Sequence, residues 1–476
     1  VWQAYNNAGG TSTYGSIDPA NPRPRCYKAS YNRPLNTRAA RPVNAYLGSE
    51  YPIDRFLEAN GYDVTYIAGV DTDRYGAKLL GRHKVFLSQG HDEYWSQKQR
   101  DNVEAARNNG MHLIFLSGNE MYWRVRWEDN YRTMVVYKES QSLVKIDPVE
   151  TEWTGTFRDS RPINPLGAQP ENAITGTIFT INAWRNDPLV VPGRYARLRQ
   201  WRNTKLATLM PNERAVLFRG ILGHEMDEDL DNGFRPEGQI RLSETLIENC
   251  MYIQDFGSTF DSGSATHHLV MYKTRANHAI VFGSGTVQWG WALDGMHDSE
   301  SGVPANVVNH LNLRVGLDIV APEIAIQQFT VNFLADMGMQ PATLYAHLTR
   351  AKASEDHTAP VCHVDLIEYH PESSTVTISV FANDVGGNHG FVGGVEIKPA
   401  GDRWHPALPA SDDDSSWYYQ FKVPDAAHLP NTAWCRATDD SLNIGEEFQY
   451  EEPKHTHETL YDVEGHIESD TMEREL

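Results

Sequence analysis

The sequence places an imidazole and a carboxylate two residues apart at a point where a strand is expected to end. Gly90-His91-Asp92-Glu93 directly follows the apolar run 84–87, and a helix is predicted to begin a few residues later. In an open α/β sheet, ligands bind and chemistry takes place at the carboxyl ends of the strands. His91 and Glu93 at such a point indicate a metal site or an acid–base pair.

The next predicted strand, 112–116, ends in Ser117-Gly118-Asn119. Because neighbouring parallel strands end at the same edge of a sheet, we expect Asn119 to lie beside His91 and Glu93. A structural alternative exists for each: Asn119 could cap a helix beginning near residue 120, and the His91/Glu93 pair could serve packing alone.

The amino-terminal segment adds two phenols to the same edge. Residues 2–7 are predicted to end the first strand, and residues 9–14 to form the loop that leaves it. Tyr5 and Tyr14 would then face the same crevice as Glu93. Tyrosines in a strand and its loop most often serve packing, so the residues alone leave both interpretations open.

Other kinds of active site lack their sequence patterns. Neither Gly-x-Ser-x-Gly nor a glycine-rich phosphate loop occurs, and neither Cys26 nor Cys250 lies at a predicted strand-to-helix turn. The net charge of -21 argues against a nucleic-acid partner, and no apolar run is long enough to cross a bilayer. A metal-assisted or acid–base reaction remains.

The elements that would position these residues form an α/β pattern followed by an all-β pattern. Helices and strands alternate from 51 to 129, with a strand expected at 64–68, which predicts a parallel sheet with helices on both faces. From about residue 360, short strands of period two alternate with Pro, Gly and Asp clusters, which is typical of an immunoglobulin-like or fibronectin-like sandwich. Cys362 and Cys435 fall on this module, either bridged or as two reduced thiols.

We therefore expect four parts, one of which contains an insertion rich in Pro, Asn and Thr. The predicted parts are a catalytic α/β domain at 1–345 with the insertion at about 151–203, a linker at 346–359, a sandwich at 360–446 and an acidic, disordered tail at 447–476. Because the chain starts at Val1 inside a predicted strand, we expect further sequence upstream.

Five short motifs, taken in order, resemble the large (beta) subunit of N,N-dimethylformamidase and its relatives. The motifs are Trp2-Gln3-Ala4-Tyr5-Asn6-Asn7, Ser12-Thr13-Tyr14, Asn60-Gly61-Tyr62-Asp63-Val64, His91-Asp92-Glu93-Tyr94 and Asn119-Glu120-Met121-Tyr122-Trp123. The similarity runs from Val1 to about Ala342. It implies a glutamine-amidotransferase-like (flavodoxin-like) fold that carries a mononuclear, non-haem ferric iron.

The resemblance also implies residue roles. The two ligand tyrosines of the family fall on Tyr5 and Tyr14, and the ligand glutamate falls on Glu93. The catalytic positions of the family fall on His91, Asn119 and Glu225. Hard anionic oxygen ligands suit a trivalent ion better than zinc, and phenolates exist near neutral pH only where a strong Lewis acid displaces the proton.

The expected function is hydrolysis of the C–N bond of a small, formamide-type amide, with Lewis-acid activation of the carbonyl and attack by water. One alternative is a zinc hydrolase that uses His91, Glu93 and a distant histidine such as His224 or His268. Another is a non-catalytic binding or scaffold protein with a degenerate amidotransferase-like domain.

The expected partners are a small amide substrate and further copies of the chain, with or without a separate small subunit. No nucleic acid and no membrane are expected. We expect a cytoplasmic location, with secretion as the alternative.

Overall fold

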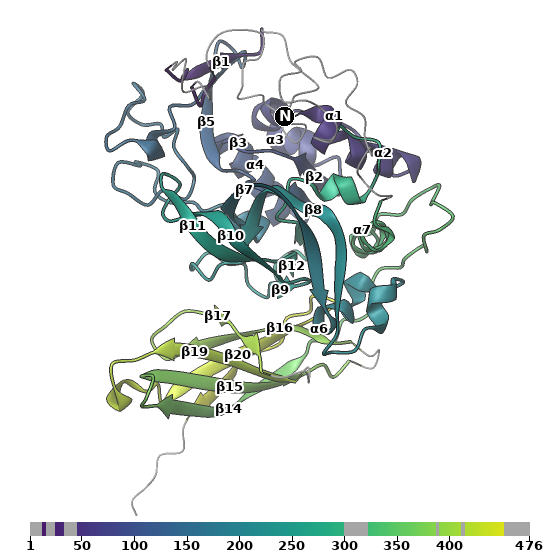
Figure 1. The fold of residues 1–476 in the computed structure, drawn as a ribbon, viewed down its shortest axis with the longest axis vertical. Helices are drawn as coiled ribbons and strands as arrows, with labels where there is room; N and C mark the ends of the chain where they lie inside the picture. The colour runs from purple at the N-terminus through teal and green to yellow at the C-terminus, as the bar shows by residue number, and fades with distance from the viewer. Residues whose placement is uncertain are drawn as a thin grey trace, which may run out of the picture.

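The computed structural model describes residues 12–15, 24–32, 45–298, 322–386, 390–410 and 415–451, and every structural statement below concerns these residues. An α/β region carries α1 to α4, an antiparallel barrel follows it, and an all-β unit lies at the opposite end of the molecule (Figure 1). No helix in this part of the chain combines the length and the apolar character that a membrane span requires.

The central sheet holds five strands in the order β2-β4-β13-β12-β9. Its strands are β2 (Val85–Gly90), β4 (His112–Ser117), β13 (Ile280–Gly283), β12 (Val270–Lys273) and β9 (Ile240–Arg241). The first three strands are parallel, whereas β12 and β9 pair antiparallel, so the sheet is mixed. Only the part that carries the predicted chemistry has the parallel order expected from the sequence.

Helices cover both faces of this sheet. The helices of the described chain are α1 (Tyr46–Ser49), α2 (Tyr51–Ala59), α3 (Gly69–Leu80), α4 (Gln97–Asn108), α5 (Asn172–Thr175), α6 (Gly193–Ala196), which contacts the antiparallel barrel, and α7 (Ile324–Asp336). Since alternate side chains of a strand point to opposite faces, Ile114 of β4 packs in one apolar cluster with α2 and α7. Its neighbour Phe115 packs in another cluster with α3, α4 and α5.

A second sheet has the order β1-β6-β5-β3. Its strands are β1 (Lys28–Ser30), β6 (Thr133–Val135), β5 (Trp123–Glu128) and β3 (Tyr94–Ser96). Two expectations fail in this region. Residues 64–68 are not a strand but the coil that enters α3, and Asn119 is followed by a turn and β5, so it does not cap a helix.

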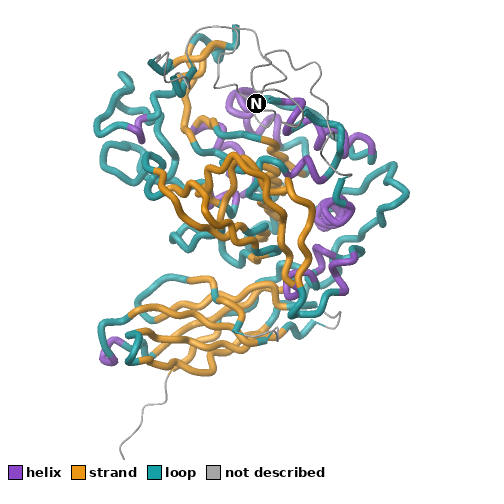
Figure 2. Tube along the Cα trace, viewed as in Figure 1, coloured by secondary structure: helices purple, strands orange, loops and turns teal. Residues whose placement is uncertain are grey.

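A closed antiparallel barrel separates the α/β region from the carboxy-terminal unit (Figure 2). It consists of β7 (Ile178–Pro192), β8 (Arg214–Glu228), β10 (Thr245–Ile253) and β11 (Phe260–His267). β7 therefore lies in the stretch expected to be an insertion. Register shifts interrupt the pairing of β7 with β8 at several points, including the stretch between Ala183 and Asn186.

The carboxy-terminal unit has two antiparallel four-stranded sheets, β14-β15-β19-β18 and β17-β16-β20-β21, that share one apolar core. The strands are β14 (Val361–His370), β15 (Thr375–Asn383), β16 (Val392–Pro399), β17 (His405–Pro406), β18 (Leu408–Pro409), β19 (Ser416–Lys422), β20 (Thr432–Asp439) and β21 (Phe448–Glu451). Cys362 of β14 and Cys435 of β20 form a disulfide, which settles the choice between a bridge and free thiols. Because β21 pairs with β20, the predicted disordered tail does not begin at 447, and residues 452–476 lie outside the described part.

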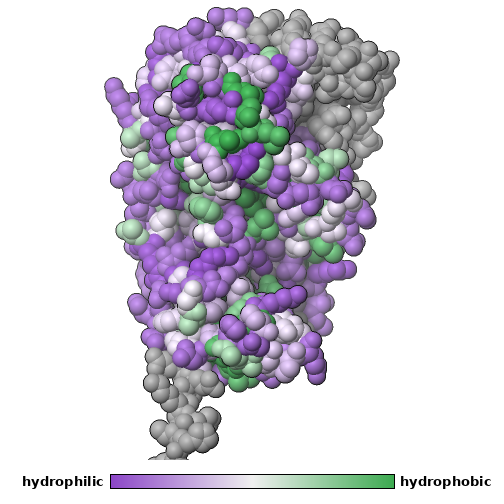
Figure 3. Space-filling view, turned by 90° about the vertical axis from the view of Figure 1, so that its left-hand side faces the viewer, coloured by the Kyte–Doolittle hydropathy of each residue, from purple (hydrophilic) through white to green (hydrophobic). Residues whose placement is uncertain are grey.

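Short 3-10 turns complete the architecture. They are η2 (Glu139–Gln141), η3 (Arg199–Trp201), η4 (Lys205–Thr208), η5 (Trp289–Ala292) and η6 (Ala426–His428). The face seen in Figure 3 is mostly hydrophilic, with a small hydrophobic group near the end of the molecule opposite the sandwich.

Candidate functional site

A glycine turns the chain out of β2 and delivers the first site residues. Gly90 has a φ of 73°, and a Cβ there would lie 2.8 Å from the Ser49 Oγ, so the turn favours glycine. His91 and Glu93 follow in the loop between β2 and β3, as the sequence predicts. The side chain of Glu93 is buried.

The loop after β4 brings Asn119 close to strand β8. A Cβ on Gly118 would lie only 2.4 Å from the backbone oxygen of Glu225, so a side chain at 118 would push the loop away. Asn119 takes a φ of 53° and donates from Nδ2 to the Glu225 Oε2 at 2.7 Å. Its backbone N–H donates to the Asp227 Oδ1 at 2.9 Å.

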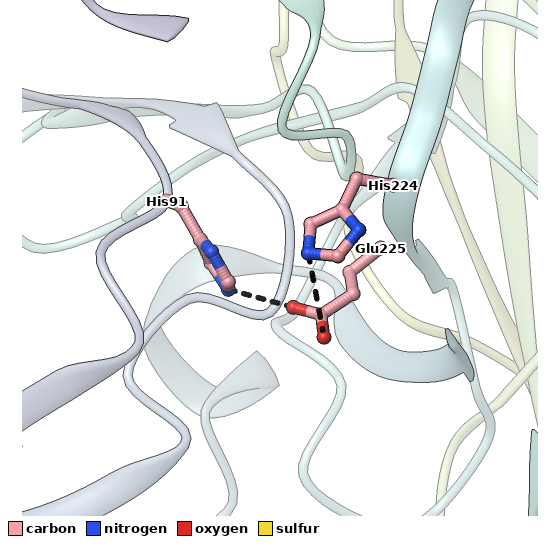
Figure 4. A group of neighbouring side chains, drawn as sticks. All are labelled: His91, His224 and Glu225. Atoms are coloured by element: carbon pink, nitrogen blue, oxygen red, sulfur yellow. Dashed lines mark ion pairs between the residues drawn. The ribbon is translucent and has the colours of Figure 1, made fainter. Parts of the chain in front are cut away.

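A local irregularity in β8 turns two successive side chains toward this loop. His224 has a φ of 59° and lies beside the register shift between β7 and β8. Such shifts re-aim side chains near functional sites. Figure 4 shows His224 and Glu225 of β8 facing His91 from the loop after β2.

His91 and Glu225 form a buried ion pair. The His91 Nε2 lies 2.6 Å from the Glu225 Oε2 and 3.7 Å from the Glu93 Oε2. The His224 Nε2 lies 3.9 Å from the Glu225 Oε1, and the rings of His91 and His224 meet edge to face at 5.3 Å. One ligand atom from each of His91, His224 and Glu225 lies within 4.8 Å of the others, so these residues form a group that could hold a metal.

Tyr14 reaches the same centre from the loop that begins the described chain. Its hydroxyl donates to the Glu93 Oε1, and it accepts a hydrogen bond from the Trp123 Nε1 at 3.2 Å. Five of the six sequence-derived candidates are thus linked by direct contacts, in the order Tyr14, Glu93, His91, Glu225 and Asn119. Tyr5 lies outside the described residues.

Lys138 is a member of the site that the sequence did not indicate. It follows β6 with no motif around it, yet its side chain is fully buried. Its Nζ lies 3.1 Å from the centroid of the Tyr14 ring and donates to the Tyr94 hydroxyl at 2.8 Å. A cation over the face of a phenol favours the phenolate.

Burial and neighbouring charges shift the pKa values of His91 and Glu225 in opposite directions. Burial is the largest single influence on His91 and disfavours its imidazolium, but the carboxylates of Glu225, Glu93 and Glu50 together raise the pKa of His91 to about 9. Burial is the largest single influence on Glu225 and would raise its pKa, but the charges of His91 and His224 and the hydrogen bonds from His91 and Asn119 together lower it to about 2. At neutral pH the pair is therefore imidazolium and carboxylate.

The pKa values of Tyr14 and Glu93 are both raised. Burial, followed by the charge of Glu93, raises the pKa of Tyr14 well above its ordinary value. Burial also raises the pKa of Glu93, although the charges of Lys138 and His91 oppose it. Burial lowers the pKa of Lys138, and the Glu93 carboxylate opposes that change.

The distant histidine required by the zinc alternative is available as His224, which lies in the group described above. His268 is not a member of that group. Burial, followed by the charge of Arg241, lowers the pKa of His268, and the charge of Asp229 opposes this change.

Comparison with known proteins identifies the chain through one family. No curated protein matches it significantly. The family model described as "N,N-dimethylformamidase beta subunit-like, C-terminal" matches residues 1–302, which include all six candidate residues. The chain therefore belongs to the N,N-dimethylformamidase beta subunit-like family.

Proposed function

We propose that this chain is an iron-dependent amidohydrolase that cleaves the C–N bond of a small, formamide-type amide. One observation carries the proposal: the Tyr14 hydroxyl meets the Glu93 carboxylate across 79 residues of sequence, next to the His91–Glu225 ion pair. The family is named after an amidohydrolase, which supports the same reaction class.

The donor set fits a hard trivalent cation. The buried Glu93 carboxylate and the phenol oxygen of Tyr14, a residue that is 38% exposed, offer two oxygens that are both anionic once Tyr14 is deprotonated. Because the pKa of Tyr14 is raised, its phenolate forms only where a strong positive charge replaces the proton. Tyr5, Tyr14 and Glu93 would hold the ion. A ferric ion bound there supplies Lewis-acid polarisation of the amide carbonyl.

Glu225 and His91 carry opposite charges, so each has a different role in proton transfer. Glu225, which is anionic, accepts a proton from the attacking water as the water oxygen bonds to the carbonyl carbon. His91, which is cationic, gives its proton to the amide nitrogen as the C–N bond breaks. The products are a carboxylic acid and an amine, and no covalent enzyme intermediate is needed. Asn119 holds the Glu225 carboxylate through its amide N–H.

We also propose a domain arrangement for the chain. We assign β2, β4 and β13 to a glutamine-amidotransferase-like sheet within a catalytic domain at 1–345, joined by a linker to the sandwich at 360–446. The Cys362–Cys435 disulfide favours an oxidising compartment, so secretion becomes the preferred location. Assembly of several copies, with or without a small subunit, remains a prediction.

A second candidate function is a zinc hydrolase. The grouping of His91, His224 and Glu225 within 4.8 Å favours it, since imidazole and carboxylate are ordinary zinc ligands. In that case Tyr14 has no place in the ligand set.

Metal analysis and absorption spectra of the protein purified without chelators test these candidates. We expect about one iron per chain, a visible phenolate charge-transfer band, and hydrolysis of formamide-type substrates. Tyr14→Phe and Glu93→Gln should lose iron, the band and, on the order of 10²-fold or more, the activity, while circular dichroism shows a folded protein. Tyr122→Phe is the matched control, because this buried tyrosine donates to the Gly257 backbone oxygen instead.

Two other results would argue against an iron-dependent enzyme. Iron, colour and activity retained in Tyr14→Phe would overturn the iron proposal. Stoichiometric zinc with no visible band would favour the second candidate.

A further inference from the structure

A second group of acidic side chains lies outside the proposed catalytic site. Asp356 precedes β14, Asp384 follows β15, and Asp439 ends β20. One carboxylate oxygen from each lies within 4.8 Å of the other two. Three segments distant in sequence therefore direct negative charge into one small volume.

Two of the carboxylate oxygens in this group are wholly buried and lack a donor. The Asp356 Oδ1 accepts from the Thr358 N–H at 2.9 Å, and the Asp384 Oδ1 accepts from the Gly386 N–H at 3.0 Å. The remaining oxygens, Asp356 Oδ2 and Asp384 Oδ2, have no hydrogen-bond partner among the described residues. A buried carboxylate oxygen without a donor or cation is strongly unfavourable.

Asp439 adds a fully buried carboxylate whose donors are all neutral. Its Oδ1 accepts from the N–H groups of Ser441 and Asn443 at 2.8 Å, and its Oδ2 accepts from the Asn443 Nδ2 at 2.9 Å. Its pKa is raised to about 7: burial is the largest cause, the carboxylates of Asp440 and Asp384 add to it, and the hydrogen bonds from Asn443 oppose it. The group therefore carries more negative charge than its neutral donors can balance.

The charge of Lys273 acts on Asp439 and Asp356, but its ammonium is bonded to other groups. The Lys273 Nζ is bonded to the Ser441 backbone oxygen at 3.1 Å and to the Asn443 Oδ1 at 3.0 Å. Arg199 gives its backbone N–H to the Asp440 Oδ2 at 2.9 Å. Among the ion pairs between described residues, none involves any of the three aspartates.

Two glycines let the backbone pass close to the carboxylates of Asp356 and Asp384. A Cβ on Gly386 would lie 3.1 Å from the Asp356 Oδ2 and 3.3 Å from the Asp384 Oδ1. A Cβ on Gly390 would lie 2.0 Å from the Asp384 Oδ2 and 3.5 Å from the Asp356 Oδ2. A side chain at 390 would therefore displace the Asp384 carboxylate from the group.

We propose that Asp356, Asp384 and Asp439 bind a calcium ion that joins the segment before β14 to the sandwich. The donor atoms are carboxylate oxygens, with no imidazole or thiol in the group, so they select a hard cation over zinc or copper. Calcium is favoured over magnesium because it accepts six to eight oxygens in variable geometry, whereas magnesium demands a near-ideal octahedron. Because the three aspartates come from separate segments, they suit calcium, whose coordination geometry is more variable than that of magnesium.

The proposed ion would also steady the contact with the rest of the molecule. Asp440, next to the ligand Asp439, accepts from Gln200 of η3 through its backbone oxygen at 2.8 Å. The Asn443 Nδ2 also lies within 3.1 Å of the Asp356 backbone oxygen. Calcium bound here would fix the turn that connects the sandwich to the α/β region, independently of the catalytic proposal.

Calcium titration of the full chain, passed first over a chelating resin, tests the site. We expect calorimetry to show one calcium ion per chain, and thermal unfolding to shift upward with millimolar calcium but not with equal magnesium. Asp384→Asn and Asp356→Asn should each weaken calcium binding at least about tenfold. Glu372→Gln, an exposed substitution on the same unit, should bind as the parent does.

Three results would overturn the proposal. They are no calcium binding by the parent at millimolar concentration, unchanged binding in both Asp384→Asn and Asp356→Asn, and an equal response to magnesium. Iron content and amide hydrolysis, measured on the same samples, report on the catalytic proposal separately.

Discussion

At the scale of single residues, the site depends on charges that are buried but paired. Glu225 contacts both His91 and Asn119, so its negative charge is held by a cation and an amide donor. Lys138 lies with its Nζ against the Tyr14 ring, and its charge opposes the rise in the pKa of Glu93. Buried charges of this kind are retained only where partners offset desolvation.

The ion pair predicts a pH dependence of stability in the metal-free protein. The folded pKa of His91, about 9, lies above its unfolded value of about 6.5. Its stabilising contribution is therefore complete below about pH 6.5 and is lost as the pH rises through 9. Glu225 is ionised in both states above about pH 5, so it does not contribute to a change over this range.

Urea unfolding of the parent and of Glu225→Gln at pH 6 and pH 9.5 measures this effect. The free energy of unfolding that the substitution removes should be larger at pH 6 by roughly 3 kcal/mol, since the variant no longer raises the pKa of His91. The exposed substitution Glu213→Gln should show no such difference. An equal loss at both pH values would contradict the assignment of charge to His91.

At the scale of elements, a buried carboxyl pair ties the loop after β2 to the loop after β4. The Ser88 Oγ lies 3.0 Å from the Asp92 Oδ2 and 2.8 Å from the Glu120 Oε1. A hydroxyl has one hydrogen, so it cannot donate to two carboxylates at once. Burial, followed by the charge of Asp92, raises the pKa of Glu120 well above its ordinary value, so Glu120 carries the second proton.

Two substitutions of Glu120 should therefore lower the free energy of unfolding by different amounts. Glu120→Gln keeps a neutral donor for Ser88 and should cost less than about 1 kcal/mol in the free energy of unfolding. Glu120→Ala leaves Ser88 and Asp92 short of a hydrogen and opens a cavity, so it should cost about 2–4 kcal/mol. Urea unfolding at pH 7 measures both, and equal losses would show that Glu120 is ionised.

At the scale of the whole molecule, the sandwich is docked through a polar contact. Glu396 of β16 accepts from the Arg436 Nε at 2.7 Å and from the Gly238 N–H at 3.0 Å. The Arg235 Nη1 lies 3.5 Å from its other oxygen, and all three charged side chains are buried. Gly238 and Arg235 lie outside the sandwich, so Glu396 joins two parts of the fold.

Glu396→Ala should weaken this docking. It removes an acceptor from two buried guanidinium groups, which should cost roughly 2–3 kcal/mol in the free energy of unfolding and speed proteolysis between 346 and 360. Glu368→Ala, on an exposed side chain of β14, should leave both within error. Unchanged proteolysis of Glu396→Ala would mean that apolar contacts alone hold the sandwich.

The sequence by itself determined the ends of β2 and β4, because hydrophobic periodicity is a local property and polar residues after a buried strand mark its carboxyl end. It also predicted the strands of the sandwich and, through family resemblance, the convergence of Tyr14, Glu93 and Glu225. Ser96 accepts from the Gln99 N–H at the start of α4, so the helix predicted to follow Glu93 begins within a few residues of it.

Only the tertiary structure decided which distant segments meet. Lys138 carries no local signal, since it enters the site through packing of the segment after β6. The sequence offered His224 only as one of two distant histidines, and the irregularity in β8 is what turns it toward His91. The mixed order of the central sheet and the disulfide between Cys362 and Cys435 were likewise settled in three dimensions. Contacts across many tens of residues depend on how whole elements pack, and the pattern along one segment does not encode that packing.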